Sequence, residues 1–80
     1  MPWNIEHTDT FSGVANYGWV NRHTVECPHD DRAKARRWLV RRAKALCGLT
    51  GQRATATDHG DMIEIRPAGL CQVVFITWTD

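Results

Sequence analysis

The side chains with the greatest chemical potential in this sequence are its three cysteines and four histidines. A zinc site would draw its ligands from Cys27 and His29, with His23, His59 or Cys71 completing the set. Structural zinc sites usually contain pairs of ligands separated by roughly two to four residues, and this sequence has no second pair of that kind. Buried thiols and surface imidazoles account for these residues better, and we therefore expect neither a metal nor another cofactor.

A catalytic cysteine would need a histidine beside it to lower the pKa of its thiol. The available pairs are Cys27 with His29 and Cys71 with His59. Neither pair is accompanied by a third orienting group or by a loop suited to an oxyanion. We therefore expect a protein that binds another macromolecule and is not an enzyme.

Carboxylates offer a further kind of chemistry, because they can bind a divalent cation. Asp58, Asp61 and Glu64 flank a predicted turn at His59-Gly60, yet their spacing differs from the order of ligands in a calcium-binding loop. A solvated acidic turn is the simpler interpretation.

Charge is segregated along the chain. The segment from Arg32 to Arg53 contains eight basic residues and no acidic one, whereas the flanks carry all nine acidic residues and only Arg22 and Arg66 as bases. The net charge of +1 is too small to predict a nucleic-acid or membrane partner from a global field. Segregation of this kind favours oriented docking onto a partner.

Two strands are predicted before the helix. Apolar and polar residues alternate from Trp3 to Phe11, Ser12-Gly13 has turn chemistry, and Val14 to Val25 is rich in residues that favour strands. Gly18 is expected to mark a bulge in the second strand. Trp3 to Phe11 is a candidate edge strand through which two copies could pair, giving a monomer or a weak homodimer.

The helix is predicted to start near Pro28 and to end near Cys47. Proline suits the first position of a helix, Asp30 and Asp31 complement the positive end of the helix dipole, and Gly48 provides a left-handed stop. On a helical wheel the apolar residues fall within one arc that should pack on a sheet: Ala35, Leu39, Val40, Ala43, Leu46 and Cys47. The opposite arc forms a basic helix face: Lys34, Arg37, Arg41 and Lys44.

Three further strands are predicted after the helix. Met62 to Arg66 reads as a strand, and Cys71 to Trp78 is apolar on both of its faces, as expected of an interior strand. Arg53 to Asp58 is rich in threonine, and whether it pairs in the sheet is left open. The expected fold is α+β, an antiparallel sheet of four to five strands in the order β-β-α-β-β-β with one amphipathic helix packed on one face.

Residues 1–80 are expected to form a single domain, because a chain of 80 residues can bury only one core. No run reaches the roughly 18 apolar residues of a membrane span, and the first residues lack the basic-then-apolar order of a signal peptide. The three cysteines, odd in number and widely spaced, are expected to be reduced and mostly buried. We expect a cytoplasmic protein from these features.

Two segments carry a resemblance to known proteins. Asp9-Thr10-Phe11-Ser12-Gly13-Val14-Ala15-Asn16-Tyr17-Gly18-Trp19-Val20 and His59-Gly60-Asp61-Met62-Ile63-Glu64-Ile65-Arg66-Pro67 resemble segments of small proteins encoded by phages and prophages, and together they cover about a quarter of the chain. The chain is also similar to the anti-CRISPR proteins, short phage products that inactivate CRISPR–Cas complexes. Among these it resembles inhibitors of the type I-C surveillance complex, Cascade.

This resemblance implies direct, stoichiometric binding to a crRNA-guided complex of Cas subunits in an infected bacterial cell, which would keep target DNA from engaging. A channel that holds nucleic acid is lined with lysine and arginine, so a small domain could block it by presenting carboxylates in place of phosphates. From charge segregation alone, we select five acidic residues as the candidate partner-binding set: Glu6, Asp9, Asp58, Asp61 and Glu64.

The alternative function is a small nucleic-acid-binding regulator that uses the basic helix face to neutralise phosphates. Stacking of bases on Tyr17, Trp19 or Trp78 would strengthen this interpretation, but such rings more often belong to the core. Salt-dependent binding to duplex DNA would separate the two functions.

Overall fold

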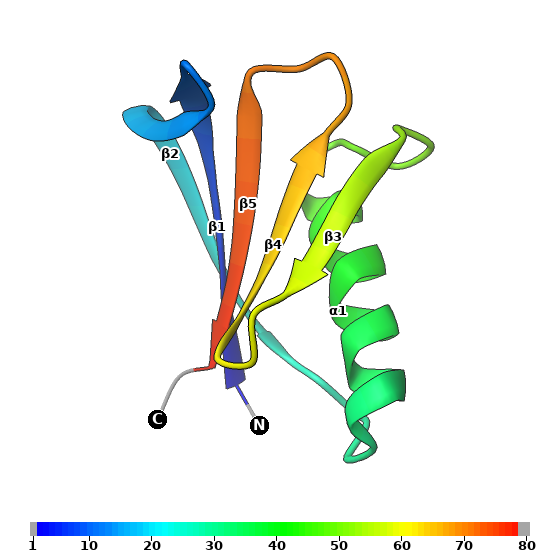
Figure 1. Ribbon diagram of the computed structural model, residues 1–80. Coiled ribbons are helices and arrows are strands. Elements are labelled where there is room, and N and C mark those ends of the chain that lie inside the picture. Colours follow the sequence, from blue (N-terminus) through cyan, green and yellow to red (C-terminus); the bar gives the residue numbers. More distant parts are fainter. Residues whose placement is uncertain (1, 79–80) are drawn as a thin grey trace.

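The strand-forming and helix-forming segments fold into two layers. The computed structural model describes residues 2–78, which form one helix and one five-stranded antiparallel sheet (Figure 1). In chain order the elements are β1 (Pro2–Phe11), β2 (Val14–Glu26), α1 (Arg32–Leu46), β3 (Ala54–Asp58), β4 (Met62–Pro67) and β5 (Gln72–Trp78). The predicted α+β class and the predicted order β-β-α-β-β-β are confirmed.

The strands lie across the sheet in the order β2-β1-β5-β4-β3. β5 therefore lies between β1 and β4, which confirms the interior position predicted from its apolar composition. The threonine-rich segment does pair, as the edge strand β3 beside β4. The prediction that Trp3 to Phe11 is an edge strand is wrong, because β5 returns to pair with β1 on the side away from β2.

The pairing register assigns the side chains of the sheet to two faces. Ile5 on β1 is level with Ile76 on β5, and Ile76 is level with Ile63 on β4, so a row of isoleucines crosses the sheet. Because side chains alternate between the faces of a strand, Val74 and Ile65 lie on the same face as this row. That face packs against α1. The opposite face, here called the open face, is not covered by α1.

The apolar arc of α1 lies on this core, as predicted. Leu39 and Ala43 are 1% and 0% exposed, and Ala35 is also buried. The other members of the predicted arc are partly buried and pack against the same cluster: Val40, Leu46 and Cys47. Since an isolated helix of 15 residues is marginally stable in water, burial of this arc is the main reason that α1 forms.

α1 begins at Arg32, four residues later than the sequence predicts. Asp31 has an extended backbone, and its side chain accepts a hydrogen bond from the Lys34 backbone N at 3.0 Å, which is the geometry of an N-cap. Pro28 therefore lies outside the helix, in the connection from β2. An aspartate cap satisfies one of the unpaired N–H groups of the first turn, whereas proline only removes one, and the cap sets the start.

The helix ends where the sequence predicts. Cys47 is the C-cap, and Gly48 has a φ of +70°, a conformation that favours glycine. The Leu49 backbone N donates a hydrogen bond to the Lys44 carbonyl oxygen at 2.7 Å, which closes the end of the helix. Within residues 2–78 no helix has the length and apolar character needed to cross a membrane.

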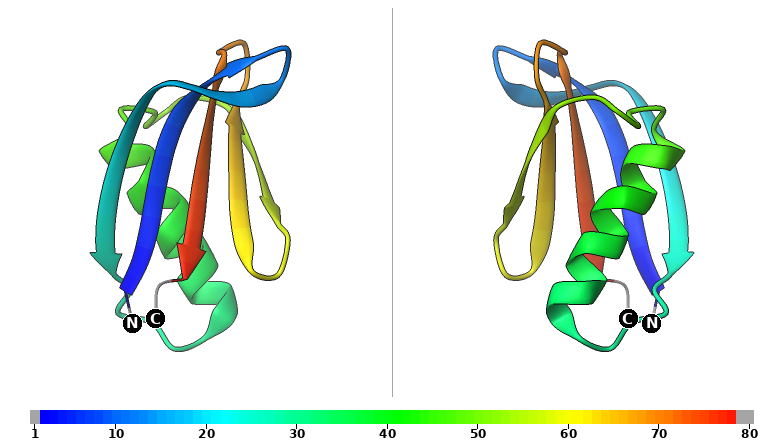
Figure 2. Two further views of the ribbon diagram at one scale, coloured as in Figure 1. Left: turned by 90° about the vertical axis from the view of Figure 1, so that its left-hand side faces the viewer. Right: turned by 90° about the vertical axis from the view of Figure 1, so that its right-hand side faces the viewer.

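The far end of the β1–β2 hairpin bends away from the helix, toward the open face (Figure 2). Arg66 on β4 donates a hydrogen bond to the carbonyl oxygen of Gly13 at the hairpin tip, at 2.7 Å. Thr8 and Val73 pair with each other on the open face, yet both are 0% exposed. The bent hairpin therefore covers this end of the open face.

Candidate functional site

Cys27 and His59, two of the side chains considered for a metal or catalytic site, contact other groups. The Sγ of Cys27 donates a weak hydrogen bond to the carbonyl oxygen of His29, with 3.7 Å between the two atoms. His59 Nε2 lies 3.2 Å from Glu64 Oε1. Within residues 2–78 no group of three histidine, cysteine, aspartate or glutamate side chains is placed to hold a metal ion.

The cysteines differ in their exposure. Cys27 is buried, Cys47 is half-buried and Cys71 is exposed, and all three are free thiols. Burial raises the pKa of Cys47 to about 11, so this thiol stays protonated at neutral pH and is a poor nucleophile. The prediction of buried thiols is wrong for Cys71, because the turn between β4 and β5 carries it to the surface.

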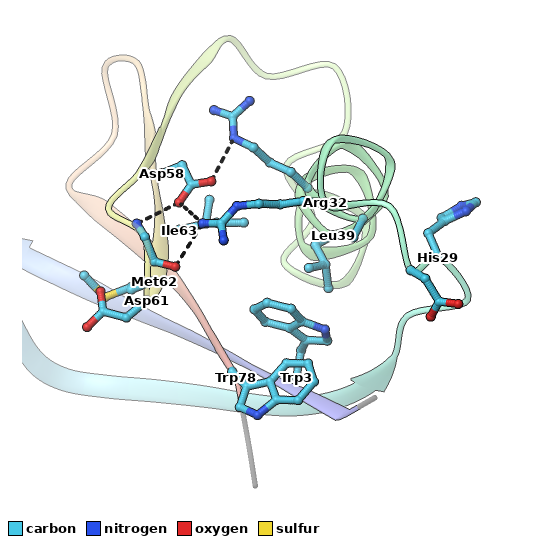
Figure 3. Close-up of a pocket in the computed structure, with 13 residues that line it drawn as sticks. Trp3, His29, Arg32, Leu39, Asp58, Asp61, Met62, Ile63 and Trp78 are labelled. Atoms are coloured by element: carbon cyan, nitrogen blue, oxygen red, sulfur yellow. Dashed lines mark hydrogen bonds and ion pairs between the residues drawn. The ribbon is translucent and has the colours of Figure 1, made fainter.

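The five acidic candidate residues do not form one surface. Glu6 and Glu64 lie on the open face, where each is level with the same residue of β5. Asp9 lies in the β1–β2 hairpin. Asp58 and Asp61 lie at the β3–β4 turn, close to the start of α1 (Figure 3). The set predicted from charge segregation is therefore divided among three places.

Glu6 is held by two partners on β2. Its Oε1 accepts a hydrogen bond from the Tyr17 hydroxyl at 2.8 Å, and its Oε2 lies 3.1 Å from Arg22 Nε in an ion pair. The hydrogen bond to Glu6 raises the pKa of Tyr17, because loss of the phenolic proton would place two negative oxygens side by side. Glu6 therefore anchors Tyr17 and is already neutralised within the fold.

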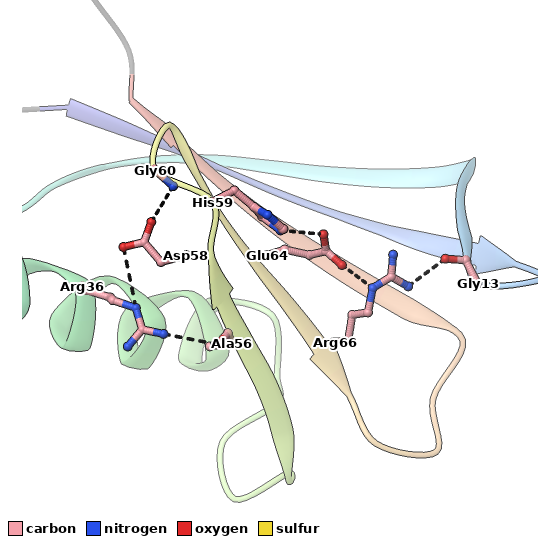
Figure 4. A network of polar contacts seen from close by, with 8 residues as sticks. All are labelled: Gly13, Arg36, Ala56, Asp58, His59, Gly60, Glu64 and Arg66. Carbon is pink, nitrogen blue, oxygen red and sulfur yellow. Dashed lines mark hydrogen bonds and ion pairs between the residues drawn. The ribbon is translucent and has the colours of Figure 1, made fainter.

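Glu64 is neutralised in a similar way (Figure 4). Its Oε2 accepts a hydrogen bond from Arg66 Nε, and His59 contacts its other oxygen. The hydrogen bond from Arg66 is the main reason that the pKa of Glu64 is lowered, although partial burial opposes the effect. Because Arg66 also binds Gly13, this pair connects β4 to the tip of the hairpin.

Asp58 joins the β3–β4 turn to the first turns of α1 (Figure 4). Its Oδ1 accepts a hydrogen bond from the Gly60 backbone N at 2.8 Å and lies 3.4 Å from Arg32 Nη2, while its Oδ2 lies 3.9 Å from Arg36 Nε. The backbone hydrogen bond lowers the pKa of Asp58, and both guanidinium groups act in the same direction. Asp61 is exposed, and its carboxylate makes no hydrogen bond or ion pair with residues 2–78.

A groove of about 610 Å³ lies beside Asp58, between the N-terminal turns of α1 and the sheet (Figure 3). Its apolar wall contains Leu39 and the indoles of Trp3 and Trp78, which meet edge to face with 5.1 Å between ring centroids. Asp58 and Arg32 both line the groove, and they form an ion pair with each other that neutralises both charges. The groove marks the junction of the two layers.

The β1–β2 hairpin contains the bulge expected in the second strand. Thr8 is level with Val20, but Thr10 is level with Ala15, so the register shifts and residues 16–19 have no level partners on β1. A bulge of this kind re-aims the side chains that it contains.

The carboxylate of Asp9 fixes the bulge from inside. It accepts hydrogen bonds from the Gly18 backbone N at 2.8 Å and from Asn16 Nδ2 at 2.9 Å, and the Trp19 backbone N lies 3.4 Å away. The hydrogen bond from Asn16 is the largest cause of the lowered pKa of Asp9. A Cβ at Gly18 would lie 2.9 Å from Asp9 Oδ2, so the bulge fits around Asp9 only with glycine at this position.

Four large apolar side chains of this hairpin are exposed, and they lie on both of its faces: the Tyr17 hydroxyl binds Glu6 on the open face, whereas the Trp19 ring meets His7, on the same face as Ile5, edge to face. We call this set the hairpin patch: Phe11, 73% exposed, Val14, 68%, Tyr17, 51%, and Trp19, 41%. The expectation that Tyr17, Trp19 and Trp78 belong to the core is wrong, since each of the three is more than 40% exposed. The signal that sequence reasoning missed is Asp9 combined with Asn16, because the carboxylate of Asp9 fixes the bulge that was expected at Gly18.

The backbone of the hairpin is strained at two positions. Ser12 has a φ of +53° and Tyr17 a φ of +55°, both in the left-handed region that side chains other than glycine rarely adopt. Such strain persists only where the surroundings determine the conformation, and it tends to occur at functional sites. At Tyr17 the surroundings are the hydrogen bond to Glu6 and the Asp9 contacts to the following residue.

The basic residues of α1 divide into two groups. Three of them hold the helix to the sheet side: Arg32 binds Asp58 and the Gly60 carbonyl, Arg36 binds the Ala56 carbonyl, and Lys44 Nζ binds the Gln52 carbonyl at 2.7 Å. Lys44 therefore does not belong to the outer face for which it was predicted. Lys34, Arg37 and Arg41 are exposed as expected, and so is Arg42.

Comparisons of the chain with protein family models, with curated proteins and with solved structures gave no match.

Proposed function

We propose that this protein is a phage anti-CRISPR protein that inhibits a type I CRISPR–Cas surveillance complex, of the I-C type, by direct stoichiometric binding. The partner is the assembly of Cas subunits on crRNA, in the cytoplasm of an infected bacterial cell, and the bound protein prevents target DNA from engaging. Two things support the proposal: the resemblance of two segments to phage proteins, and the exposed hairpin patch that one of those segments forms.

The hairpin patch is the observation that carries the proposal. Its four residues lie within the segment from Asp9 to Val20 that resembles phage proteins, and each of them is more than 40% exposed. Tyrosine and tryptophan are enriched in the energetically dominant centres of protein interfaces, where charged residues are depleted. A patch of this composition fits a protein surface better than it fits a small molecule.

Contacts within the fold hold the hairpin in one conformation before a partner binds. Asp9 holds the bulge, Glu6 holds the Tyr17 side chain, and Arg66 holds the tip at Gly13. A surface that is already ordered loses less conformational entropy when it binds.

Docking through carboxylates that mimic phosphates has less support than docking through the hairpin patch. Glu6, Asp58 and Glu64 are paired with arginines, and Asp9 is bound to Asn16 and to backbone N–H groups. Charge reversal at these four positions would therefore disturb the fold together with the charge. Asp61 is the acidic candidate at which reversal changes charge alone, so Asp61→Lys is the clean test of mimicry.

The proposal is tested by titrating purified type I-C complex, loaded with crRNA, with this protein and measuring its binding to a labelled target duplex. We expect loss of DNA binding that is complete near one protein per inhibited complex. The double variant Phe11→Ser/Tyr17→Ser should lose most of this inhibition while it remains folded by circular dichroism. The matched control is Leu70→Ser, an exposed apolar residue that lies outside the hairpin patch.

Full inhibition by the hairpin variant would remove the patch from the proposal. Absence of inhibition by the natural protein at a large molar excess would contradict the proposed function itself.

A further inference from the structure

The outer surface of α1 carries positive charge that the fold does not use. Among the exposed residues of the helix, the basic ones that do not contact the sheet side form a set that we call the free basic face: Lys34, Arg37, Arg41 and Arg42. None of their side chains makes an ion pair or hydrogen bond with residues 2–78. This set differs from the predicted basic helix face: Lys44 is held by the Gln52 carbonyl, and Arg42, about 140° around the helix from Arg37, lies at the border of the set.

Along α1 itself no acidic residue offsets this charge, and Asp30 and Asp31 lie only at its N-terminal end, beside Lys34. The segment from Arg32 to Arg53 contains no acidic residue. Asp58 is occupied by Arg32 and Arg36 of α1, and Glu6 and Glu64 are paired with arginines of the sheet. The small net charge of the chain therefore conceals a surface that is locally cationic.

The composition of the exposed helix surface distinguishes between two classes of anionic partner. The centre of a protein interface needs apolar or aromatic anchors, but the exposed large apolar residues of the described chain all lie outside α1. Apart from its basic residues, α1 exposes only Ala33 and Ala45. A surface of cations and small residues suits a polyanion without apolar patches.

The spacing of the free basic face fits a repeating anion. Lys34, Arg37 and Arg41 follow one another along a straight helix, and at 1.5 Å per residue they are separated along its axis by about 4.5 Å and about 6 Å. Three of the four side chains are arginines, whose planar guanidinium binds phosphate through two parallel hydrogen bonds.

We infer that the free basic face of α1 is a binding site for the phosphate backbone of a nucleic acid, without base specificity. This site lies on a different element from the hairpin patch, and it goes beyond the proposed inhibition. On a target that contains protein and nucleic acid, the hairpin patch would contact protein and the free basic face would contact RNA or DNA.

The test is fluorescence anisotropy of a labelled duplex DNA of random sequence, titrated with the full chain at several salt concentrations. Three to four phosphate contacts predict an affinity that falls about 40- to 150-fold between about 50 and 200 mM salt. Arg41→Gln should lower the slope of log K against log salt by about 0.9. Arg22→Gln is the matched control, because Arg22 is exposed but paired with Glu6, and its slope should equal that of the natural protein.

No binding at about 50 mM salt would overturn the inference, as would equal effects of Arg41→Gln and Arg22→Gln. Binding of polyglutamate as tight as that of DNA would overturn it in favour of an acidic protein partner. The hairpin variant Phe11→Ser/Tyr17→Ser should bind DNA normally. The two tests are therefore independent. Absence of inhibition would not contradict DNA binding by the free basic face, and absence of DNA binding would not contradict inhibition through the hairpin patch.

Discussion

Asp9 is the residue on which the exposed hairpin depends most directly. Its carboxylate accepts the backbone N–H of Gly18 and the side chain of Asn16, and so it closes the bulge that carries Tyr17 and Trp19. An acidic residue that looked like a docking charge from the sequence therefore acts as an internal support.

Replacement of Asp9 by asparagine should loosen the bulge, because an amide is a weaker acceptor than a carboxylate and one of its ends is a donor. We expect a lower Tm and faster amide hydrogen exchange at Gly18 than in the natural protein. Asp61→Asn, at an exposed carboxylate without partners in residues 2–78, is the control and should change neither quantity. Unchanged exchange at Gly18 in Asp9→Asn would show that the bulge does not need the carboxylate.

The cysteines provide a second test at the scale of single residues. Iodoacetamide at neutral pH should label Cys71 first, because Cys71 is exposed, while Cys27 is buried. Cys47 should react slowly, since a thiol whose pKa is about 11 contains little thiolate. Peptide mapping by mass spectrometry measures the order. Labelling of Cys47 before Cys71 would contradict the burial described for the helix end.

At the scale of elements, the N-cap of α1 decides where the helix starts. Asp31→Ala should cost about 1 kcal/mol of unfolding free energy, because the Lys34 N–H loses its acceptor. Asp30→Ala is the matched control, and a change within about 0.5 kcal/mol is expected for this exposed neighbour. Urea denaturation measures both. Equal losses in the two variants would mean that Asp31 stabilises the helix only through its charge.

The elements were predictable from the sequence where periodicity reflects burial. The apolar arc with Leu39 and Ala43, and the apolar strand before Trp78, were identified because a buried face repeats with the period of its element. The start of α1 differs from the prediction because both Pro28 and Asp31 are good start signals, and the hydrogen bond from the Lys34 backbone N to Asp31 places the start after Asp31.

The candidate site was less predictable than the fold. Alternation along β2 does not reveal that the register shifts at Asp9, so the exposure of Tyr17 and Trp19 could not be read from their parity. The hydrogen bonds of the basic side chains were equally hidden, because Lys44 and Arg42 are both basic residues of the same helix, and the sequence does not tell that Lys44 reaches the Gln52 carbonyl oxygen.

At the scale of the whole molecule, stability should depend on pH through the paired carboxyls. The pKa values of Asp9, Asp58 and Glu64 are lowered in the folded state from 3.8, 3.8 and 4.5. At acidic pH the unfolded chain therefore binds more protons than the folded one, so their stabilisation is full above about pH 5 and is lost as pH falls through the folded-state values. The raised pKa of Tyr17 acts in the opposite direction, with stability lost as pH rises above 10.

Circular dichroism melts across the pH range should show a plateau of Tm with a decline at both ends. Glu64→Gln removes one of the titrating groups and should make the acid decline shallower than in the natural protein. A Tm that rises as the pH falls from 5 to 3 would show that the ion pairs of Asp58 and Glu64 contribute nothing to folding.

The molecule as a whole separates its two free surfaces. The hairpin patch lies on the β1–β2 hairpin, which bends away from the helix, and the free basic face lies on α1. Two surfaces of different chemistry on one small protein are suited to a large assembly that contains both protein and nucleic acid.

The most direct test of this account is affinity capture from cells that contain a type I-C complex, with the natural protein and the Phe11→Ser/Tyr17→Ser variant as parallel baits. Mass spectrometry and RNA analysis of the captured material should find Cas subunits with crRNA on the natural protein and little of either on the variant. Capture of the same complex by both baits would contradict docking through the hairpin, and capture of no Cas subunit by the natural protein would contradict the proposed function.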